Sequence, residues 1–179
     1  YRIFVAEFLL QQTDAPRVVP VYEALLADYP SLSDLAQASE EDMSIKLQPL
    51  GFHFRAPRLV QAAKLIMANH GTAVPSDEAA LVALPGVGRY IARSICTNAF
   101  GQKLAVLDTN VARILQRFFG LTLTRARARN DPRLWEAAQR IAVKENVARW
   151  NLTLIDFGAS VCTTRNPKCQ VCPLNERCH

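Results

Sequence analysis

The sequence predicts an all-α protein, and two observations lead there. Apolar residues recur every three or four positions in several windows, as at Ile3, Phe4 and Phe8, which is the spacing of one helix face. No segment alternates apolar and polar residues as a half-buried strand would. The chain has 179 residues, of which 50% are hydrophobic. That is enough to bury a core in one domain or in two small lobes.

Helices are expected in close succession along the chain. Their predicted ranges are 1–12, 17–28, 39–47, 55–69, 77–83, 88–100, 109–119, 132–141 and 150–161. Ser39 with Asp42 resembles a capping box, and Ser76 is a good N-cap for the helix over 77–83. Gly71 and Gly120 follow helix ends as stops. Cys96 falls on an apolar helix face and is expected to be buried.

The net charge of +5 fits a polyanionic partner, although many basic proteins bind nothing acidic. The basic stretch 125–129 has no hydrophobic period, so we expect a solvated connection able to touch phosphate. No apolar run approaches the roughly 20 residues of a membrane span, and no signal peptide is visible. We expect an intracellular protein of the cytoplasm or nucleoid. The sequence starts at Tyr1 inside a helical pattern, which suggests a short upstream segment.

A glycine pair lies between two predicted helices, in Gly86-Val87-Gly88. Glycines let the backbone turn tightly and bring its N–H groups close to a ligand. At a helix start these groups and the helix dipole favour an anion, for which a nucleic-acid phosphate is the obvious candidate. A plain connection between two helices would look the same. Asp108 favours the functional interpretation, because it follows one helix and one turn later, although an Asp before a helix is often only an N-cap.

Four of the five cysteines lie in the last eighteen residues: Cys162, Cys169, Cys172 and Cys178. Disulfides are disfavoured because the rest of the chain looks like a reduced, well-cored protein. A zinc site usually has two C-x2-C knuckles, and only one is present. Four thiolates around an iron–sulfur cluster fit better, although the spacing C-x6-C-x2-C-x5-C is not that of ferredoxins.

Together the hairpin, Asp108 and the cysteines resemble the helix-hairpin-helix DNA glycosylase superfamily, over nearly the whole chain. The cysteine spacing matches the [4Fe-4S] loop of its endonuclease III and adenine glycosylase branches. The resemblance implies two helical lobes with a DNA-binding cleft between them. One lobe, residues 10–118, would contain the helix-hairpin-helix. The other, residues 1–9 and 119–179, would carry the cluster.

The resemblance also assigns roles to residues. Base excision requires the nucleotide to be flipped out of the duplex. Gly86, Val87, Gly88 and Arg89 would hold the DNA backbone, while Phe52 would wedge into the gap beside Gln11 and Gln12. Glu7, in a segment like the E-x-x-L-Q-Q-T of adenine glycosylases, would enter the base pocket. Asp108 would stabilise the oxocarbenium-like sugar and direct water.

Two positions bear on the reaction and the substrate. Endonuclease III-type members carry a Lys where this chain has Tyr90, and a Tyr cannot form a Schiff base, so we expect hydrolysis without strand cleavage. Leu152 stands where adenine glycosylases place a Gln or Glu that bonds adenine. Tyr90, Leu152 and the Asp156-Phe157 pair resemble the thymine mismatch glycosylases, whereas Gln11-Gln12-Thr13 resembles the adenine branch.

We therefore expect a monomeric, monofunctional glycosylase that removes T or U opposite G from double-stranded DNA. One alternative is an adenine glycosylase without its C-terminal domain. Another is a non-catalytic protein that binds DNA structures, against which the presence of Asp108 argues.

Overall fold

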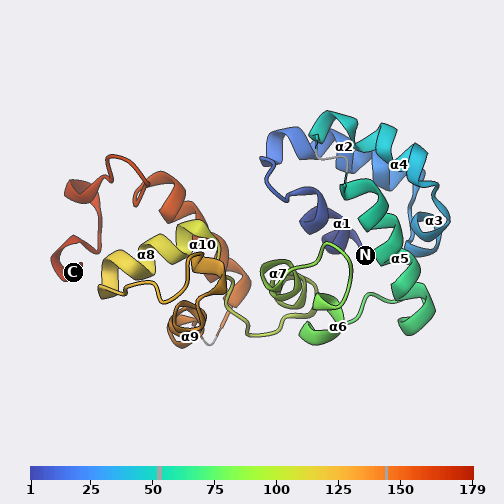
Figure 1. Ribbon diagram of the computed structural model, residues 1–179. Coiled ribbons are helices and arrows are strands. Elements are labelled where there is room, and N and C mark those ends of the chain that lie inside the picture. The colour runs from blue at the N-terminus through green and yellow to red at the C-terminus, as the bar shows by residue number, and fades with distance from the viewer. Residues whose placement is uncertain (52–53, 144) are drawn as a thin grey trace. The chain divides into compact units, whose positions relative to one another are not determined.

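The computed structural model describes residues 1–51, 54–143 and 145–179. Helices and turns make up these residues, with no strand among them, so the predicted all-α class is confirmed (Figure 1). The α-helices are α1 (Arg2–Leu9), α2 (Ala15–Asp28), α3 (Leu32–Gln37), α4 (Glu40–Leu47), α5 (Arg55–His70), α6 (Glu78–Val82), α7 (Arg89–Phe100), α8 (Thr109–Phe119), α9 (Pro132–Ile141) and α10 (Val147–Ser160). Short 3₁₀ turns are η1 (Gln48–Leu50), η2 (Ala128–Asn130), η3 (Cys169–Val171) and η4 (Asn175–Arg177).

Several helix ends differ from the prediction, each for a local reason. α1 stops at Leu9, because the loop after it passes through Gln12 in the left-handed region, with φ of 56°. Asp77 rather than Ser76 caps α6, by accepting a hydrogen bond from the Ala80 N–H over 2.8 Å. α10 begins at Val147, three residues earlier than expected, behind an N-cap at Asn146.

The short helix α3 was not predicted. Its N-terminus carries a reciprocal capping box, in which the side chain of Ser31 accepts from the Asp34 N–H and the Asp34 carboxylate accepts from the Ser31 N–H. Such a box stabilises a helix that is too short to show a hydrophobic period.

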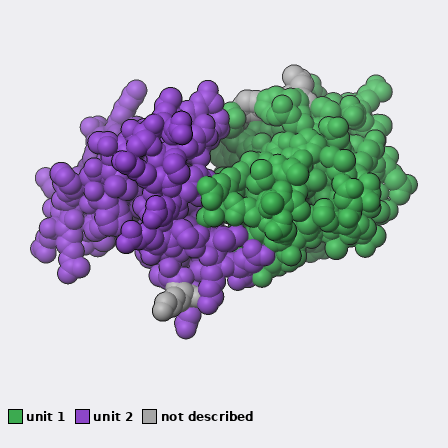
Figure 2. Space-filling model, turned by 60° about the horizontal axis from the view of Figure 1, so that its bottom comes forward, with its two compact units in different colours: residues 1–100 green, residues 101–179 purple. Residues whose placement is uncertain are grey.

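The chain divides into two compact units, residues 1–100 and 101–179, drawn in green and purple in Figure 2. Within the first unit, α1 packs on α2 and α7. The predicted lobes, residues 10–118 and residues 1–9 with 119–179, divide the chain differently and stay a prediction. Across the described residues, no helix is long and apolar enough to cross a bilayer.

The core of the first unit forms around α5, which packs on α3 and α4. Leu59 and Ile66 of α5 and Leu35 of α3 are fully buried. Each such side chain contributes roughly 1.5–3 kcal/mol by leaving water. This packing fixes the start of α5, where Arg55 lies.

In the second unit α8 packs on both α9 and α10. Leu115 of α8 and Leu134 of α9 are buried. α10 comes very close to the start of α8 at Gly158, where an added Cβ would lie 2.6 Å from the Cβ of Asn110. A glycine is therefore required at this crossing, two residues from Asp108.

Candidate DNA interface and active site

The turn between α6 and α7 is a tight hairpin that depends on Gly86. This residue has a φ of 82°, in the left-handed region where a side chain costs about 1–2 kcal/mol. An added Cβ would lie 2.8 Å from Cζ of Phe8, so backbone and space both require glycine. Val87 is buried, whereas Gly88 is exposed with open space around its Cα. The buried Val87 anchors the turn, and Gly88 leaves its backbone accessible to a phosphate.

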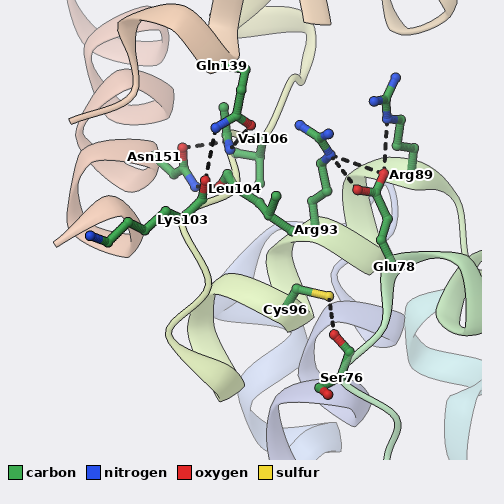
Figure 3. A network of polar contacts seen from close by, with 11 residues as sticks. Ser76, Glu78, Arg89, Arg93, Cys96, Lys103, Leu104, Val106, Gln139 and Asn151 are labelled. Atoms are coloured by element: carbon green, nitrogen blue, oxygen red, sulfur yellow. Dashed lines mark hydrogen bonds and ion pairs between the residues drawn. The ribbon is translucent and has the colours of Figure 1, made fainter. Parts of the chain in front are cut away.

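Ion pairs between α6 and α7 join the two helices of the hairpin (Figure 3). The Glu78 carboxylate of α6 accepts hydrogen bonds from Nε of Arg89 at 3.1 Å and from Nε of Arg93 at 3.0 Å, both on α7. Arg93 is only 8% exposed, which places this pair in a setting with less solvent screening than a surface pair has. Arg89, whose contact with DNA stays a prediction, thus also holds the hairpin together.

The loop after α1, which carries Gln11 and Gln12, is held by the buried guanidinium of Arg55. Its Nη1 donates to the Leu9 carbonyl over 2.9 Å, and its Nη2 donates to the Gln11 carbonyl and to Oγ1 of Thr13. Burial lowers the pKa of Arg55 from its ordinary value. Gln11 in turn donates from Nε2 to the Gly86 carbonyl over 3.3 Å. The structure therefore brings Gln11 to the hairpin.

Glu7, on α1, is half-buried and accepts a side-chain hydrogen bond from α7. Its Oε1 accepts a hydrogen bond of 2.6 Å from the hydroxyl of Ser94, which lies on α7. Ser94 in turn accepts from Nδ2 of Asn98 over 3.0 Å. Burial raises the pKa of Glu7, while the Ser94 hydrogen bond acts in the opposite direction. Shifted carboxyl groups of this kind are typical of acid–base sites.

In the second unit Asp108 caps α8, as an Asp in that position often does. One carboxylate oxygen accepts from the Val111 N–H over 2.7 Å, and the other from Nδ2 of Asn110 over 2.9 Å. Both oxygens are thereby fixed in place, and the residue stays partly exposed. An oriented, accessible carboxylate can stabilise positive charge that develops on a substrate.

The segment before Asp108 is extended but belongs to no sheet, and amide side chains satisfy its backbone (Figure 3). Gln139 of α9 donates to the Lys103 carbonyl and accepts from the Ala105 N–H. Asn151 of α10, 5% exposed, donates to the Leu104 carbonyl over 3.0 Å and accepts from the Val106 N–H over 3.3 Å. Because buried backbone groups need partners, these two amides fix the backbone segment that leads to Asp108.

A continuous set of hydrogen bonds connects Asp108 with the cysteine loop. Asn110, which donates to Asp108, accepts from Nη2 of Arg113 over 2.8 Å. The same nitrogen donates to the Gly158 carbonyl, and Nε of Arg113 donates to the Cys162 carbonyl over 2.7 Å. Two side chains, Asn110 and Arg113, therefore connect Asp108 with the backbone of the first cysteine.

The cysteine loop fits an iron–sulfur cluster by the chemistry of its donors. All four cysteines have free thiols. The first and last meet at one residue, since Nη1 of Arg117 lies 3.5 Å from Sγ of Cys162 and Sγ of Cys178 lies 3.7 Å from the Arg117 carbonyl. Cys169 and Cys172 share one 3₁₀ turn. No three candidate ligands among the described residues gather closely enough for a single ion.

The other predicted residues lie as follows. Tyr90 is half-buried on the first turn of α7. Leu152 is 55% exposed on α10, and Gln12 is exposed beside Gln11. Phe52 lies outside the described residues. Thus the first unit gathers Glu7, Gln11 and the hairpin, and the second gathers Asp108 and the cysteine loop.

Two family models match this chain, and the first of them extends across both compact units. A family model described as HhH-GPD superfamily base excision DNA repair protein matches residues 5–139. A second model, the iron-sulfur binding domain of endonuclease III, matches residues 162–178. That second match confirms the predicted iron–sulfur cluster.

Several characterised proteins are similar along almost the whole chain. A thymine-DNA glycosylase of Aeropyrum pernix is 40% identical over 99% of this chain and 81% of its own length. A thymine/uracil-DNA glycosylase of Pyrobaculum aerophilum is 36% identical over 97% of this chain and 77% of its own. An adenine DNA glycosylase of Mycobacterium tuberculosis is 38% identical, and the match covers 58% of its length. The solved structure of a thermostable thymine-DNA glycosylase matches with a TM-score of 0.92 and 31% identity, over 99% of this chain and 82% of the other.

The first family match covers both the α6–α7 hairpin and Asp108, and it defines a helix-hairpin-helix DNA repair protein. The chain belongs to the HhH-GPD superfamily of base excision DNA repair proteins. Its C-terminal segment is an iron–sulfur binding domain of the endonuclease III kind.

Proposed function

We propose that this protein is a DNA glycosylase that hydrolyses the N-glycosidic bond of thymine or uracil opposite guanine, without cutting the strand. The family supports glycosylase chemistry on DNA, and the names of two of the relatives reported above favour thymine and uracil. Double-stranded DNA with a mismatched base would be its substrate, bound by a monomer inside the cell.

The proposal is carried by the residue types at two positions that the family resemblance assigns to base recognition, Tyr90 in the first unit and Leu152 in the second. Leu152 offers no hydrogen-bonding group, and its exposed side chain is free to contact the methyl group of thymine. Tyr90 adds bulk beside the hairpin and leaves less room for a purine. A site that binds its substrate by hydrogen bonds rejects analogues strongly, so an adenine pocket without a polar group at position 152 would be poor.

Asp108 would supply the main chemical contribution. Loss of the base leaves positive charge on the sugar, and an ionised carboxylate held by Val111 and Asn110 stabilises that charge without having to reorganise. The same carboxylate can orient the attacking water. Its fixed geometry is the reason we assign this role to Asp108 and not to another acid.

Glu7 would act on the base. With its pKa raised by burial, the carboxyl group can keep a proton or share one with the flipped base. Ser94 and Asn98 orient it from α7. Gln11 is aligned by Gly86 and would contact the opened duplex next to the hairpin.

The iron–sulfur cluster would be held by Cys162, Cys169, Cys172 and Cys178. When bound, it supplies structural cross-linking of the loop and the potential for electron transfer. Hydrolysis of the glycosidic bond needs no electrons, so we assign the residues around Arg113 and Arg117 to the positioning of the loop.

A second candidate, adenine excision, is favoured by the Gln11-Gln12-Thr13 segment and by the adenine glycosylase among the relatives. A panel of duplexes separates the two. Single-turnover excision should be fast for G·U and G·T and at least about tenfold slower for A·G and A·8-oxoguanine. Leu152→Gln should shift the preference toward adenine. If the unaltered protein removes adenine faster than thymine, the proposed substrate is wrong.

A further inference from the structure

The loop between α8 and α9 is rich in arginine and has few acidic residues. From residue 121 to residue 140 the sequence has five arginines and only two acidic residues. Arg125, Arg127 and Arg129 alternate with small residues and are all exposed. Within the described part of the chain, none of these three guanidinium groups pairs with a carboxylate.

One of the two acids, Asp131, is turned inward and is 0% exposed. Its Oδ2 accepts from the Thr124 N–H at 2.5 Å and from the Thr124 hydroxyl at 2.9 Å, while Oδ1 accepts from the Arg133 N–H at 3.0 Å. The backbone N–H of Arg125 also contributes, and these hydrogen bonds hold the pKa of Asp131 below its usual value. Asp131 thus bonds backbone groups on both sides of the loop, at Thr124 and Arg133, and among the described residues it forms no ion pair with the three arginines.

A second contact fixes the far side of the loop. The buried indole of Trp135 donates from Nε1 to the Arg129 carbonyl over 2.8 Å. Between these anchors the backbone makes a 3₁₀ turn, in which Asn130 donates to the Arg127 carbonyl and Asp131 to the Ala128 carbonyl. The backbone of the loop is therefore ordered by specific hydrogen bonds, while its three arginine side chains are exposed, as expected for a solvated connection.

We propose that the loop around Arg125, Arg127 and Arg129 is a second phosphate-binding surface of the protein, separate from the hairpin, that contacts the backbone of duplex DNA. The inference rests on the proposed function in that it takes DNA as the partner. Guanidinium forks bind phosphate oxygens well, and a backbone already ordered by Asp131 and Trp135 reduces the entropy lost on binding.

The loop composition favours a duplex over a single strand. Single-stranded nucleic acid is bound through stacking of bases on aromatic side chains. Residues 124–131 contain no aromatic residue. Contacts limited to phosphates position a duplex without reading its sequence. We therefore expect the loop to strengthen binding equally for different sequences.

The test measures the salt dependence of binding to an undamaged, fluorescein-labelled duplex between 50 and 200 mM KCl. The variant Arg125→Gln/Arg127→Gln removes two loop charges. The control Arg2→Gln/Lys64→Gln removes two exposed charges in the first unit. Each lost phosphate contact lowers the slope of log affinity against log salt by about 0.9. We expect a decrease of about 1–2 for the loop variant, with roughly tenfold weaker binding at 50 mM, and little change for the control.

Equal effects of the two double variants would mean that only net charge matters and would overturn the proposal, as would an unchanged slope for the loop variant. Asp131→Asn keeps every arginine but puts an amide donor against N–H groups, so it should weaken binding in the same direction. Circular dichroism checks that this variant is folded, and if it unfolds the arginine variant still decides. Because the duplex is undamaged, failure of the substrate assignment would appear only in the excision assay.

Discussion

The hydroxyl of Ser94 donates a hydrogen bond of 2.6 Å to Oε1 of Glu7, which lies 87 positions earlier in the chain, and so joins α7 to α1. Burial raises the pKa of Glu7 above the ordinary 4.5, and the Ser94 hydrogen bond lowers it in part. The carboxyl group that would meet the flipped base is thus tuned by the hairpin helix α7.

This tuning makes stability depend on pH. Between the ordinary pKa and the raised one, the folded protein binds more protons than the unfolded chain, so stability falls as pH rises through that interval. Glu7→Gln removes the charge that burial penalises. It should therefore raise the melting temperature at pH 7.5 but hardly at pH 4, while slowing excision. The exposed Glu23→Gln is the matched control, and a Glu7→Gln protein that melts lower than wild type at pH 7.5 would contradict the argument.

Asp108→Asn should lower the rate of base excision by about 10²–10⁴ and leave DNA binding within a few-fold, because it removes charge but keeps shape. Asn is as good an N-cap as Asp, so α8 should stay capped. Single-turnover kinetics measure the loss. Asp77→Asn makes the same change at the N-cap of α6 and should keep normal rates. An active Asp108→Asn protein would remove Asp108 from the mechanism.

Two glycine substitutions in the hairpin should have different effects. Gly86→Ala meets Phe8 and needs a left-handed backbone, so it should cost at least about 1–2 kcal/mol of stability. Gly88→Ala meets no atom within 4 Å and should leave stability unchanged. Its methyl group would still hinder a phosphate, so DNA affinity should fall. Thermal melts and binding titrations separate these effects, and a Gly88→Ala protein that binds DNA normally would argue against phosphate contact there.

Tyr90 should prevent strand cleavage. The wild-type protein should give no covalent DNA adduct on borohydride reduction, since there is no Lys from Gly88 up to Lys103. Tyr90→Lys should create a trappable imine if this position faces the sugar. Tyr22→Lys, on α2, adds the same amine elsewhere and should trap nothing. An adduct with the wild-type protein would require another amine.

Cys169→Ala should lose iron and the brown colour with it, because one of four thiolate ligands is removed. Excision should fall as well, since Cys162 is bonded through Arg113 and Asn110 to Asp108. Cys96→Ala is the control, because Cys96 is buried on α7 and bonded to the Ser76 carbonyl. Stoichiometric zinc in place of iron in the wild-type protein would overturn the assignment of the cluster.

Much of the helical architecture was predictable because it depends on local pattern. α8 was placed to the residue, since its cap at Asp108 and stop at Gly120 both have short-range signatures. Asn146 and Ser31 were overlooked as caps, although both residue types are usual there. α3 has too few residues to show a period.

The supporting residues of the site were not predictable in the same way. Arg55 and Ser94 act on residues 44 and 87 positions away, and Gln139 and Asn151 bond a backbone segment that has no secondary structure. In each case the partner is set by how helices pack, which no local pattern in a single sequence reveals.

Each compact unit is continuous in the sequence, with the first ending at Phe100 and every cluster cysteine following Val161. During synthesis the N-terminal part of a chain emerges and folds first. The Glu7–Ser94 bond, the Arg55 contacts and the Gly86 turn can therefore all form while the ribosome is still adding the cysteine loop. We expect delivery of iron and sulfide to be the final maturation step, acting on a nascent protein whose hairpin is already built.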